Sequence, residues 1–283
     1  MSFLITGANG LIGSDLVKIL SKNSKVIAIY RKKRNKKINN KNITWVRKDL
    51  IKKLKLKYRP KYIINCVIDQ SYKKDSKKYI KRNILIVKNI IDYAKKNKVE
   101  LIFNLSSIDI YGFVQKGAAI ETNIPKKQSN YGNLKYMIEK LISNSKCNFF
   151  NLRLPGILFF GFKNVADRPW VNSIIHKLIN NKSIKIYNPE QKFNNVTSSI
   201  EISRFIIFTI KNKIFNLTLN FASKHPLTII KIIKHIKKKL NSKSVVKKIY
   251  NKKSKGFYIS IDKLVKKTKF KPTSTIKLIN QFL

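Results

Sequence analysis

The chain has 283 residues, 43% of them hydrophobic, which is enough for a substantial core in one large domain or two unequal ones. No apolar run reaches the ~18 residues that a membrane-spanning helix needs, so we expect no membrane span. The 62 basic and 13 acidic residues give a net charge of +49. Because the lysines are scattered over every expected helix and loop, the charge favours nonspecific attraction to polyanions over a dedicated nucleic-acid surface.

The N-terminal stretch predicts a strand, a glycine turn and a helix. Residues 2–6 are apolar, glycines follow at positions 7, 10 and 13, and an apolar helical pattern begins among them. Glycine permits a tight turn, a close approach of the backbone to a diphosphate and close packing of helix on strand. The helix start adds free N–H groups and a positive dipole end. The alternative is a tight turn that binds nothing. The expected cofactor contacts are Thr6, Gly7, Asn9, Gly10, Leu11, Ile12 and Gly13.

The second strand, 25–30, completes a βαβ unit and ends at Arg31, the start of a basic loop over 31–37. An acid near this position holds the ribose 2′-hydroxyl of NAD, whereas basic residues accommodate the 2′-phosphate of NADP. We therefore expect Arg31 to contact the cofactor and NADP to be slightly favoured over NAD.

Asp49 and Leu50 follow a short third strand at 43–46. Asp49 lies where a carboxylate could meet an adenine amino group, and we take both residues as cofactor contacts. The alternative for Asp49 is a cap for a helix over 51–57.

Further strands at 61–67, 100–106 and 148–152 alternate with helices at 73–97 and 129–145. This alternation predicts an α/β fold with a doubly wound parallel sheet, a Rossmann dinucleotide-binding domain over 1–153. Residues 154–283 predict a smaller α+β substrate-binding subdomain, some segments of which return to the main sheet. Its expected helices and strands are 170–179, 183–187, 200–210, 214–220, 227–240 and a last helix ending at 283, with a lysine-rich surface loop at 242–255.

Tyr131 and Lys135 are four residues apart at the start of a predicted helix and share one helix face. A lysine ammonium beside a phenol lowers its pKa from ~10, so that the tyrosine can exchange a proton with a sugar or alcohol oxygen. Ser107 follows the fifth strand, where its hydroxyl could hold the same oxygen. Tyr136 and Lys140 repeat the spacing, but Tyr136 lies deeper in the helix and is as plausible a core aromatic.

Cysteine and histidine give no sign of a metal centre. Cys66 and Cys147 both lie in apolar runs and are expected to be small buried residues, and the three histidines have no metal-ligand spacing. The first strand begins at Ser2, which leaves no room for a signal peptide. We therefore expect a cytoplasmic enzyme without a metal.

The chain resembles the extended short-chain dehydrogenase/reductases, the NAD-dependent epimerase/dehydratase family that acts largely on nucleotide sugars. The resemblance spans nearly the whole chain, through several segments in order. These are the glycine turn, Asn83, the serine segment 106–112 with Ser107 four residues before Tyr111, the segment Tyr131 to Lys135, the segment 153–156, the segment 193–195 with Glu201, and the segment 270–272.

The resemblance implies NAD(P)-dependent redox chemistry at a sugar carbon. Tyr131 would be the general acid/base, Lys135 its electrostatic partner and ribose anchor, and Ser107 the clamp on the substrate oxygen. Further cofactor contacts implied are Asn83, Tyr131, Lys135 and Pro155. Substrate contacts implied are Ser107, Asp109, Tyr131, Asn194 and Asn195. The activity expected is a nucleotide-sugar epimerase or 4-ketoreductase.

The chain departs from the family pattern at two places, and the first of them bears on the reaction. The 4,6-dehydratase branch carries threonine, aspartate and glutamate where this chain has Ser107, Ile108 and Asp109, and the single acid disfavours water elimination. Segments 65–67 and 69–71 depart from the usual small-residue run. The alternatives are a catalytically weak NAD(P)-binding regulatory protein and, less favoured, a basic nucleic-acid-associated protein. A homodimer through helices 73–97 and 129–145 is also expected.

Overall fold

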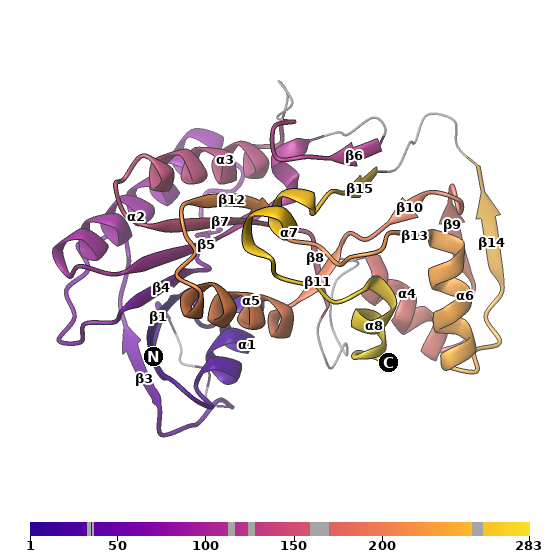
Figure 1. The fold of residues 1–283 in the computed structure, drawn as a ribbon, viewed down its shortest axis with the longest axis horizontal. Coiled ribbons are helices and arrows are strands. Elements are labelled where there is room, and N and C mark those ends of the chain that lie inside the picture. The colour runs from indigo at the N-terminus through magenta and orange to yellow at the C-terminus, as the bar shows by residue number, and fades with distance from the viewer. Residues whose placement is uncertain (33–34, 36, 113–116, 124–127, 159–169, 251–256) are drawn as a thin grey trace. The chain divides into compact units, whose positions relative to one another are not determined.

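The computed structural model describes all residues except 33–34, 36, 113–116, 124–127, 159–169 and 251–256 (Figure 1). The chain forms two compact units. The first unit comprises Met1–Ile110, Lys127–Arg153 and Ser203–Leu219, and the second comprises Tyr111–Lys126, Leu154–Ile202 and Asn220–Leu283. The chain therefore passes between the two units several times, since Tyr111–Lys126 belongs to the second unit and Ser203–Leu219 to the first.

A seven-stranded sheet forms the centre of the first unit, in the order β12-β7-β5-β4-β1-β2-β3. Its strands are β1 Ser2–Thr6, β2 Lys25–Tyr30, β3 Ile43–Arg47, β4 Tyr62–Asn65, β5 Leu101–Ser107, β7 Phe149–Leu154 and β12 Leu217–Asn220. The pairs β1–β2, β2–β3, β1–β4 and β4–β5 are parallel. The doubly wound parallel sheet predicted from the sequence is confirmed. Its order reverses between β1 and β4, and such a switch point is where these sheets bind ligands.

Helices cover both faces of this sheet. Figure 1 shows α2 (Ser76–Lys96) and α3 (Asn130–Ser143) on one face, with α1 (Leu11–Leu20) and α5 (Ser199–Lys211) on the other. Side-chain caps start α2 and α3, because Asp75 accepts from Lys78 N and Ser129 accepts from Gly132 N. The two helices meet through a buried cluster that includes Tyr79, Val87, Ile91, Leu134, Ile138 and Ile142.

A row of hydrogen-bonded polar side chains crosses the same sheet. Thr6 Oγ1 donates to Asn65 Oδ1 at 2.9 Å, and Asn65 Nδ2 donates to Asn104 Oδ1 at 3.0 Å. Asn104 Nδ2 donates to Asn151 Oδ1 at 2.9 Å, and Asn151 Nδ2 to Thr218 Oγ1 at 3.1 Å. The strand register aligns Thr6 with Asn65 and Asn65 with Asn104, so that each side chain can hydrogen-bond to the one on the next strand. We call these five residues the asparagine row.

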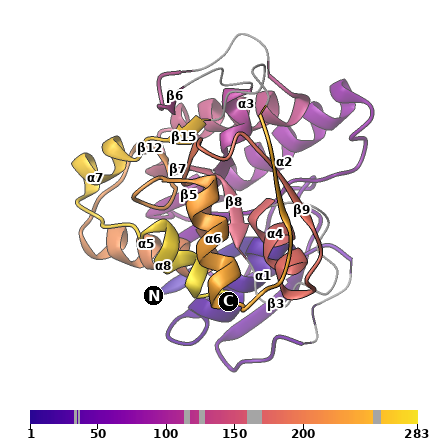
Figure 2. The same cartoon turned by 90° about the vertical axis from the view of Figure 1, so that its right-hand side faces the viewer.

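The second unit is built from two-stranded pairings. They join β6 Gly117–Ala119 to β15 Phe257–Ile259, β8 Gly156–Leu158 to β11 Val196–Ser198, β9 Ile184–Tyr187 to β14 Val246–Ile249, and β10 Lys192–Phe193 to β13 Leu227–Thr228. The helices are α4 Trp170–Ile179, α6 Ile229–Lys239, α7 Asp262–Thr268 and α8 Thr275–Asn280, and a short 3₁₀ turn, η1, spans Ile108–Tyr111 at the edge of the first unit. Figure 2 shows α6 lying beside α4, and their apolar faces share one core with α8.

Two segments differ from the sequence analysis, namely the helix over 51–57 that was the alternative for Asp49 and the surface loop expected at 242–255. Residues 51–57 form turns and irregular backbone rather than a helix, because Asn89 Nδ2 donates to the carbonyls of Leu50 and Ile51, which a helix would need for its own bonds. The lysine-rich stretch 242–255 is not simply a loop, since β14 forms within it by pairing with β9. Among the described residues, no helix combines the length and apolarity that crossing a membrane requires.

Candidate functional site

The turn after β1 requires glycine at two positions. Gly7 has φ +67°, and a Cβ there would lie 3.0 Å from Val67 Cα. A Cβ on Gly13 would lie 2.2 Å from the carbonyl oxygen of Gly7, so that no side chain fits between helix and turn. The first turn of α1 leaves N–H groups without partners inside the helix. This backbone cradle fits a diphosphate, which is the group that the turn is expected to hold.

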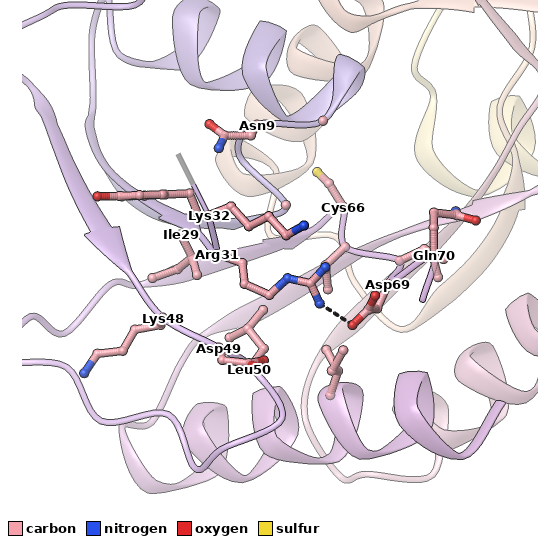
Figure 3. Close-up of a pocket in the computed structure, with 16 residues that line it drawn as sticks. Asn9, Ile29, Arg31, Lys32, Lys48, Asp49, Leu50, Cys66, Asp69 and Gln70 are labelled. Atoms are coloured by element: carbon pink, nitrogen blue, oxygen red, sulfur yellow. Dashed lines mark hydrogen bonds and ion pairs between the residues drawn. The ribbon is translucent and has the colours of Figure 1, made fainter. Parts of the chain in front are cut away.

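A cavity of about 380 Å³ opens beside the turn (Figure 3). Its walls come from the segments that follow β1, β2, β3 and β4. Six of the predicted cofactor residues line it, namely Gly7, Asn9, Gly10, Arg31, Asp49 and Leu50. Asp49 is exposed and accepts from Ile51 N at 3.2 Å, which fixes a turn and not the helix cap that was the alternative.

The other predicted cofactor residues of the first unit have different surroundings. The Thr6 hydroxyl belongs to the asparagine row, and the Leu11 side chain is exposed. Asn83 is buried, where its amide bonds to the backbone of Asp69 and to the carbonyl of Tyr79. Pro155 is buried in the second unit, between β7 and β8. These contacts give Thr6 and Asn83 structural tasks at the edge of the cavity.

Sequence reasoning missed Asp69, a carboxylate in the cavity wall. Its Oδ2 accepts from Arg31 Nη1 and Arg82 Nε, and its Oδ1 accepts from Ser71 N at 2.9 Å. The backbone N–H of Asp69 donates to Asn83 Oδ1 at 2.8 Å, and Asn83 Nδ2 donates to the carbonyl of Asp69 at 3.0 Å. Burial alone would raise the pKa of Asp69, but the hydrogen bonds from Arg82, Ser71 and Arg31 hold that pKa well below its usual range. The signal available was the acidic residue in the segment 69–71, which departs from the family pattern.

A second, strongly basic cavity of about 500 Å³ adjoins the first. Five cationic side chains and one carboxylate line it, namely Arg31, Lys32, Arg47, Lys48, Lys52 and Asp49. It lies where β2 and β3 end, the position at which a doubly wound fold meets the ribose of its dinucleotide. The arrangement is chemically suited to an anionic group such as a phosphate.

The three predicted catalytic residues come together at the carboxyl end of β5 and the start of α3. The hydroxyl of Tyr131 lies near the side chain of Ser107, which acts to lower the pKa of the phenol. The ammonium of Lys135 lies 5.7 Å from the centroid of the Tyr131 ring and donates to the Leu105 carbonyl at 2.6 Å. The helix starts close against η1, since a Cβ on Gly132 would lie 2.2 Å from the carbonyl oxygen of Asp109.

The electrostatics of this group differ from the sequence expectation. Burial raises the pKa of Tyr131, and the negative charge of Asp109 raises it further, while the Ser107 side chain acts the other way. The sequence analysis expected Lys135 to lower the pKa of Tyr131, and in this structure that pKa is raised instead, with burial as the main cause. Burial lowers the pKa of Lys135 to about 8, against the opposing influence of nearby Cys66, Glu139 and Asp109.

The second tyrosine–lysine pair has the same local geometry without the same surroundings. Lys140 Nζ lies 5.5 Å from the centroid of the Tyr136 ring, so that spacing alone does not single out Tyr131. Lys140 is exposed, whereas Lys135 is buried at 4% exposure. The contact with Ser107 and the burial of its lysine distinguish Tyr131.

The predicted substrate residues differ in their availability. Asp109 is exposed in η1. Asn194 is buried in the second unit, where its Nδ2 donates to the carbonyls of Ser223 and Ile259 and its Oδ1 accepts from Ile259 N. Both amide hydrogens of Asn194 are thus used within the fold, which argues against a substrate contact. Asn195 Oδ1 is buried and has no hydrogen-bond partner in the described part of the chain.

A doubly wound sheet with this glycine turn, and with serine, tyrosine and lysine gathered at the end of β5, defines a dinucleotide-binding protein of the short-chain dehydrogenase/reductase type. Residues 3–193 match the model of the NAD dependent epimerase/dehydratase family, and the chain belongs to that family. The family resemblance inferred from the sequence is confirmed.

Comparison with individual proteins agrees with this assignment. A curated relative, the uncharacterized protein MJ1055 of Methanocaldococcus jannaschii, is 25% identical over 98% of this chain and 93% of its own length. The UDP-glucuronic acid 4-epimerase of Bacillus cereus, solved with NAD, superposes with a TM-score of 0.75 at 20% identity, covering 100% of this chain and 97% of that one. The UDP-glucose 4-epimerase of Thermotoga maritima, solved with UDP-glucose, gives 0.76 at 18% identity, with 99% of each chain covered. At these identities the two structures establish the fold.

Proposed function

We propose that this protein is an NAD(P)-dependent nucleotide-sugar epimerase or 4-ketoreductase. One observation carries the proposal, namely that the buried ammonium of Lys135 lies 5.7 Å from the centroid of the Tyr131 ring, with Ser107 beside the Tyr131 hydroxyl. These groups lie at the carboxyl end of β5, the edge of the parallel sheet at which the glycine turn also lies. The two similar 4-epimerases of UDP-linked sugars support the substrate class and a reaction at carbon 4.

Each of the three side chains has a task in such a reaction. When bound, the nicotinamide supplies a place to which hydride can pass from a sugar carbon and from which it can return. Tyr131 begins as a neutral phenol, because its pKa is raised, and it exchanges its proton with the sugar hydroxyl or carbonyl oxygen. Ser107 holds that oxygen within reach of Tyr131. The Lys135 ammonium donates to the Leu105 carbonyl and has further donors for a ribose hydroxyl of the cofactor.

The cofactor is proposed to lie along the glycine turn and the cavity that Gly7, Asn9, Asp49 and Leu50 line. The five cations of the adjoining basic cavity favour a phosphate near the end of β2, and so NADP over NAD. The neighbouring structure solved with NAD supports a nicotinamide dinucleotide in general.

Substitution of Tyr131 tests the proposal, with Tyr136→Phe as the matched control. Purified variants are incubated with UDP-hexoses and their 4-keto derivatives, and the configuration at carbon 4 is followed by NMR. We expect Tyr131→Phe to lower kcat about 10²- to 10⁴-fold, since general acid–base catalysis supplies that much. Tyr136→Phe is the matched control, because Tyr136 stands on the same helix with the same lysine spacing, and it should keep its turnover, because the lysine beside it, Lys140, is exposed. Full turnover in Tyr131→Phe would refute the proposed mechanism.

A second candidate is a dinucleotide-binding regulatory protein with weak or no catalysis. The raised pKa of Tyr131 favours it, because such a phenol is a weaker acid and is seldom ionised near neutral pH to the phenolate that would act as base. Native mass spectrometry of the purified protein separates the cases. Retained NAD(H) together with turnover indicates an epimerase, exchangeable NADP(H) with turnover a reductase, and bound cofactor without turnover on the panel the regulatory alternative.

We also propose a homodimer through α2 and α3. Each of these helices exposes a large apolar side chain, Leu85 on α2 and Met137 on α3. Light scattering after size-exclusion chromatography measures the mass directly. A dimer that dissociates in Leu85→Lys would support the proposal, and a monomeric wild type would refute it.

A further inference from the structure

An ion pair bridges two loops beside the first cavity. Arg31 follows β2 and Asp69 follows β4, the two strands that flank β1 on either side. Figure 3 shows the Arg31 side chain extending from the end of β2 to the Asp69 carboxylate, with the dashed line marking their contact. Both residues line the cavity beside the glycine turn. The pair therefore lies where the ribose end of a dinucleotide is expected.

Asp69 is the fixed member of this pair. Its side chain is 2% exposed, its backbone is held on both sides by Asn83, and its Oδ1 accepts from Ser71 N. Arg82 contacts the same carboxylate oxygen as Arg31 does. A buried carboxylate needs a compensating cation, and Arg82 still provides one if Arg31 leaves.

Arg31 is the movable member. Its side chain is 41% exposed, and it also lines the basic cavity with Lys32, Arg47, Lys48 and Lys52. A guanidinium binds a phosphate through two parallel hydrogen bonds, a stronger arrangement than a single contact with a carboxylate oxygen that is already shared. Arg31 thus stands between two anionic partners, one built into the protein and one that a ligand would bring.

We propose that Asp69 sets the discrimination between NADP and NAD by competing with the 2′-phosphate of the cofactor for Arg31. The proposal rests on the proposed function, because it assumes that a dinucleotide occupies the cavity. Without a 2′-phosphate, Arg31 stays on Asp69. When the phosphate is present, it draws Arg31 into the basic cavity while Arg82 continues to neutralise Asp69. Asp69 therefore lowers the affinity for NADP and has little influence on that for NAD.

A double-mutant cycle measured by isothermal titration calorimetry with NADP⁺ and NAD⁺ tests this competition. We expect Asp69→Asn, which keeps the shape and removes the charge, to raise NADP⁺ affinity about tenfold and to change NAD⁺ affinity by less than about twofold. Arg31→Gln should lower NADP⁺ affinity about tenfold. In the Arg31→Gln background, Asp69→Asn should no longer change the NADP⁺ to NAD⁺ ratio, because the side chain competed for is gone.

Two further variants make the test specific. Lys32→Gln removes a cation from both cavities, and no ion pair between Lys32 and Asp69 is found in the described residues, so the effect of Asp69→Asn should persist in full in that background. Arg82→Gln leaves Arg31 as the main cation on Asp69, which should hold Arg31 more tightly and lower NADP⁺ affinity about fivefold. Arg82→Gln also tests the inference if Asp69→Asn does not fold, which circular dichroism shows.

The outcomes separate this inference from the proposed function. If the wild type and every folded variant bind neither dinucleotide, the proposed function fails. If both dinucleotides bind but Asp69→Asn and Arg82→Gln leave the ratio of their affinities unchanged, the competition is overturned while the proposed function stands. Opposite shifts in these two variants would establish it.

Discussion

The two halves of α3 each carry a buried charged side chain, one in an ion pair and the other hydrogen-bonded to a backbone carbonyl. In the C-terminal half, the Glu139 carboxylate accepts from Arg153 Nε at 3.1 Å and from Arg153 Nη2 at 2.8 Å, and both partners are buried. In the N-terminal half, Lys135 is equally buried but donates to the Leu105 carbonyl and makes no ion pair among the described residues. The two residues are one helical turn apart.

This difference separates an ion pair that serves the fold from a lysine for which we propose a chemical task. A buried ion pair with two hydrogen bonds across it satisfies its own charges and serves the fold. A buried ammonium that has only a carbonyl is costly, as the lowering of its pKa to about 8 indicates. Proteins tolerate such costs mainly where chemistry needs them. The contrast therefore supports a chemical task for Lys135 and none for Arg153.

Breaking the buried ion pair between Glu139 and Arg153 should have the largest effect on stability. Glu139→Leu leaves the Arg153 guanidinium buried without its carboxylate, and we expect the free energy of unfolding to fall by about 3–5 kcal/mol. Urea denaturation followed by circular dichroism measures this change.

The double variant Glu139→Leu/Arg153→Leu sharpens this prediction. Because it removes both charges, it should recover most of the lost stability. If the double variant is as unstable as the single one, the loss comes from packing and not from the buried charge of Arg153.

The asparagine row should show the next largest effect. The row is connected to the C-terminal half of α3, since Asn151 Nδ2 also donates to the Glu139 carbonyl at 3.4 Å. Asn104→Ala removes the middle of the row and leaves Asn65 Nδ2 and Asn151 Oδ1 buried without those partners. We expect a loss of about 2–4 kcal/mol in the same denaturation assay, from two unsatisfied polar groups and a small cavity.

Asn133→Ala is the control for this prediction, because Asn133 is an exposed asparagine on α3. Its substitution should change the stability by less than about 0.5 kcal/mol. Equal effects from the two substitutions would mean that the row contributes nothing beyond ordinary surface amides.

Local sequence signals predicted the parts of the site that follow one another in the chain. The strand over 2–6, the glycine turn and the spacing of Tyr131 and Lys135 each depend on neighbouring residues, and the structure has a strand, a tight turn and a shared helix face at those places. The alternation of strands and helices likewise predicted the doubly wound sheet, because parallel strands need crossover connections.

Long-range partnerships could not be predicted in this way. Arg31 and Asp69 are 38 residues apart and meet only because the strand order places β2 and β4 on either side of β1. The helix over 51–57, the alternative that would have made Asp49 a cap, does not form, and the carbonyls of Leu50 and Ile51 accept from Asn89, a residue of α2. The lowered pKa of Lys135 depends on burial by elements distant in sequence.

Removing the buried charge of Lys135 should have the smallest effect on stability, and it should raise the stability instead of lowering it. Lowering the pKa of Lys135 from 10.5 to about 8 corresponds to a cost of about 3 kcal/mol at 1.36 kcal/mol per unit. Lys135→Met removes that cost but leaves the Leu105 carbonyl without this donor, which costs about 1–3 kcal/mol. We therefore expect Lys135→Met to be more stable than the wild type by about 1 kcal/mol at pH 7 while losing turnover.

The stability difference between Lys135→Met and the wild type should depend on pH, in a direction that follows from the lowered pKa of Lys135. Below pH 8 the lysine is protonated in both folded and unfolded states, so that the wild type bears the full cost of burying the charge. Between about pH 8 and 10.5 the folded state loses its proton first, the unfolded state binds more protons, and the wild type gains stability relative to Lys135→Met. The advantage of about 1 kcal/mol should therefore shrink and reverse within this range, because the wild type gains about 1.36 kcal/mol per pH unit there. At the top of the range only the lost hydrogen bond remains. Lys140→Met, on the exposed side of the same helix, should show no such trend, and an advantage for Lys135→Met that persists at pH 10.5 would show that charge burial is not its cause.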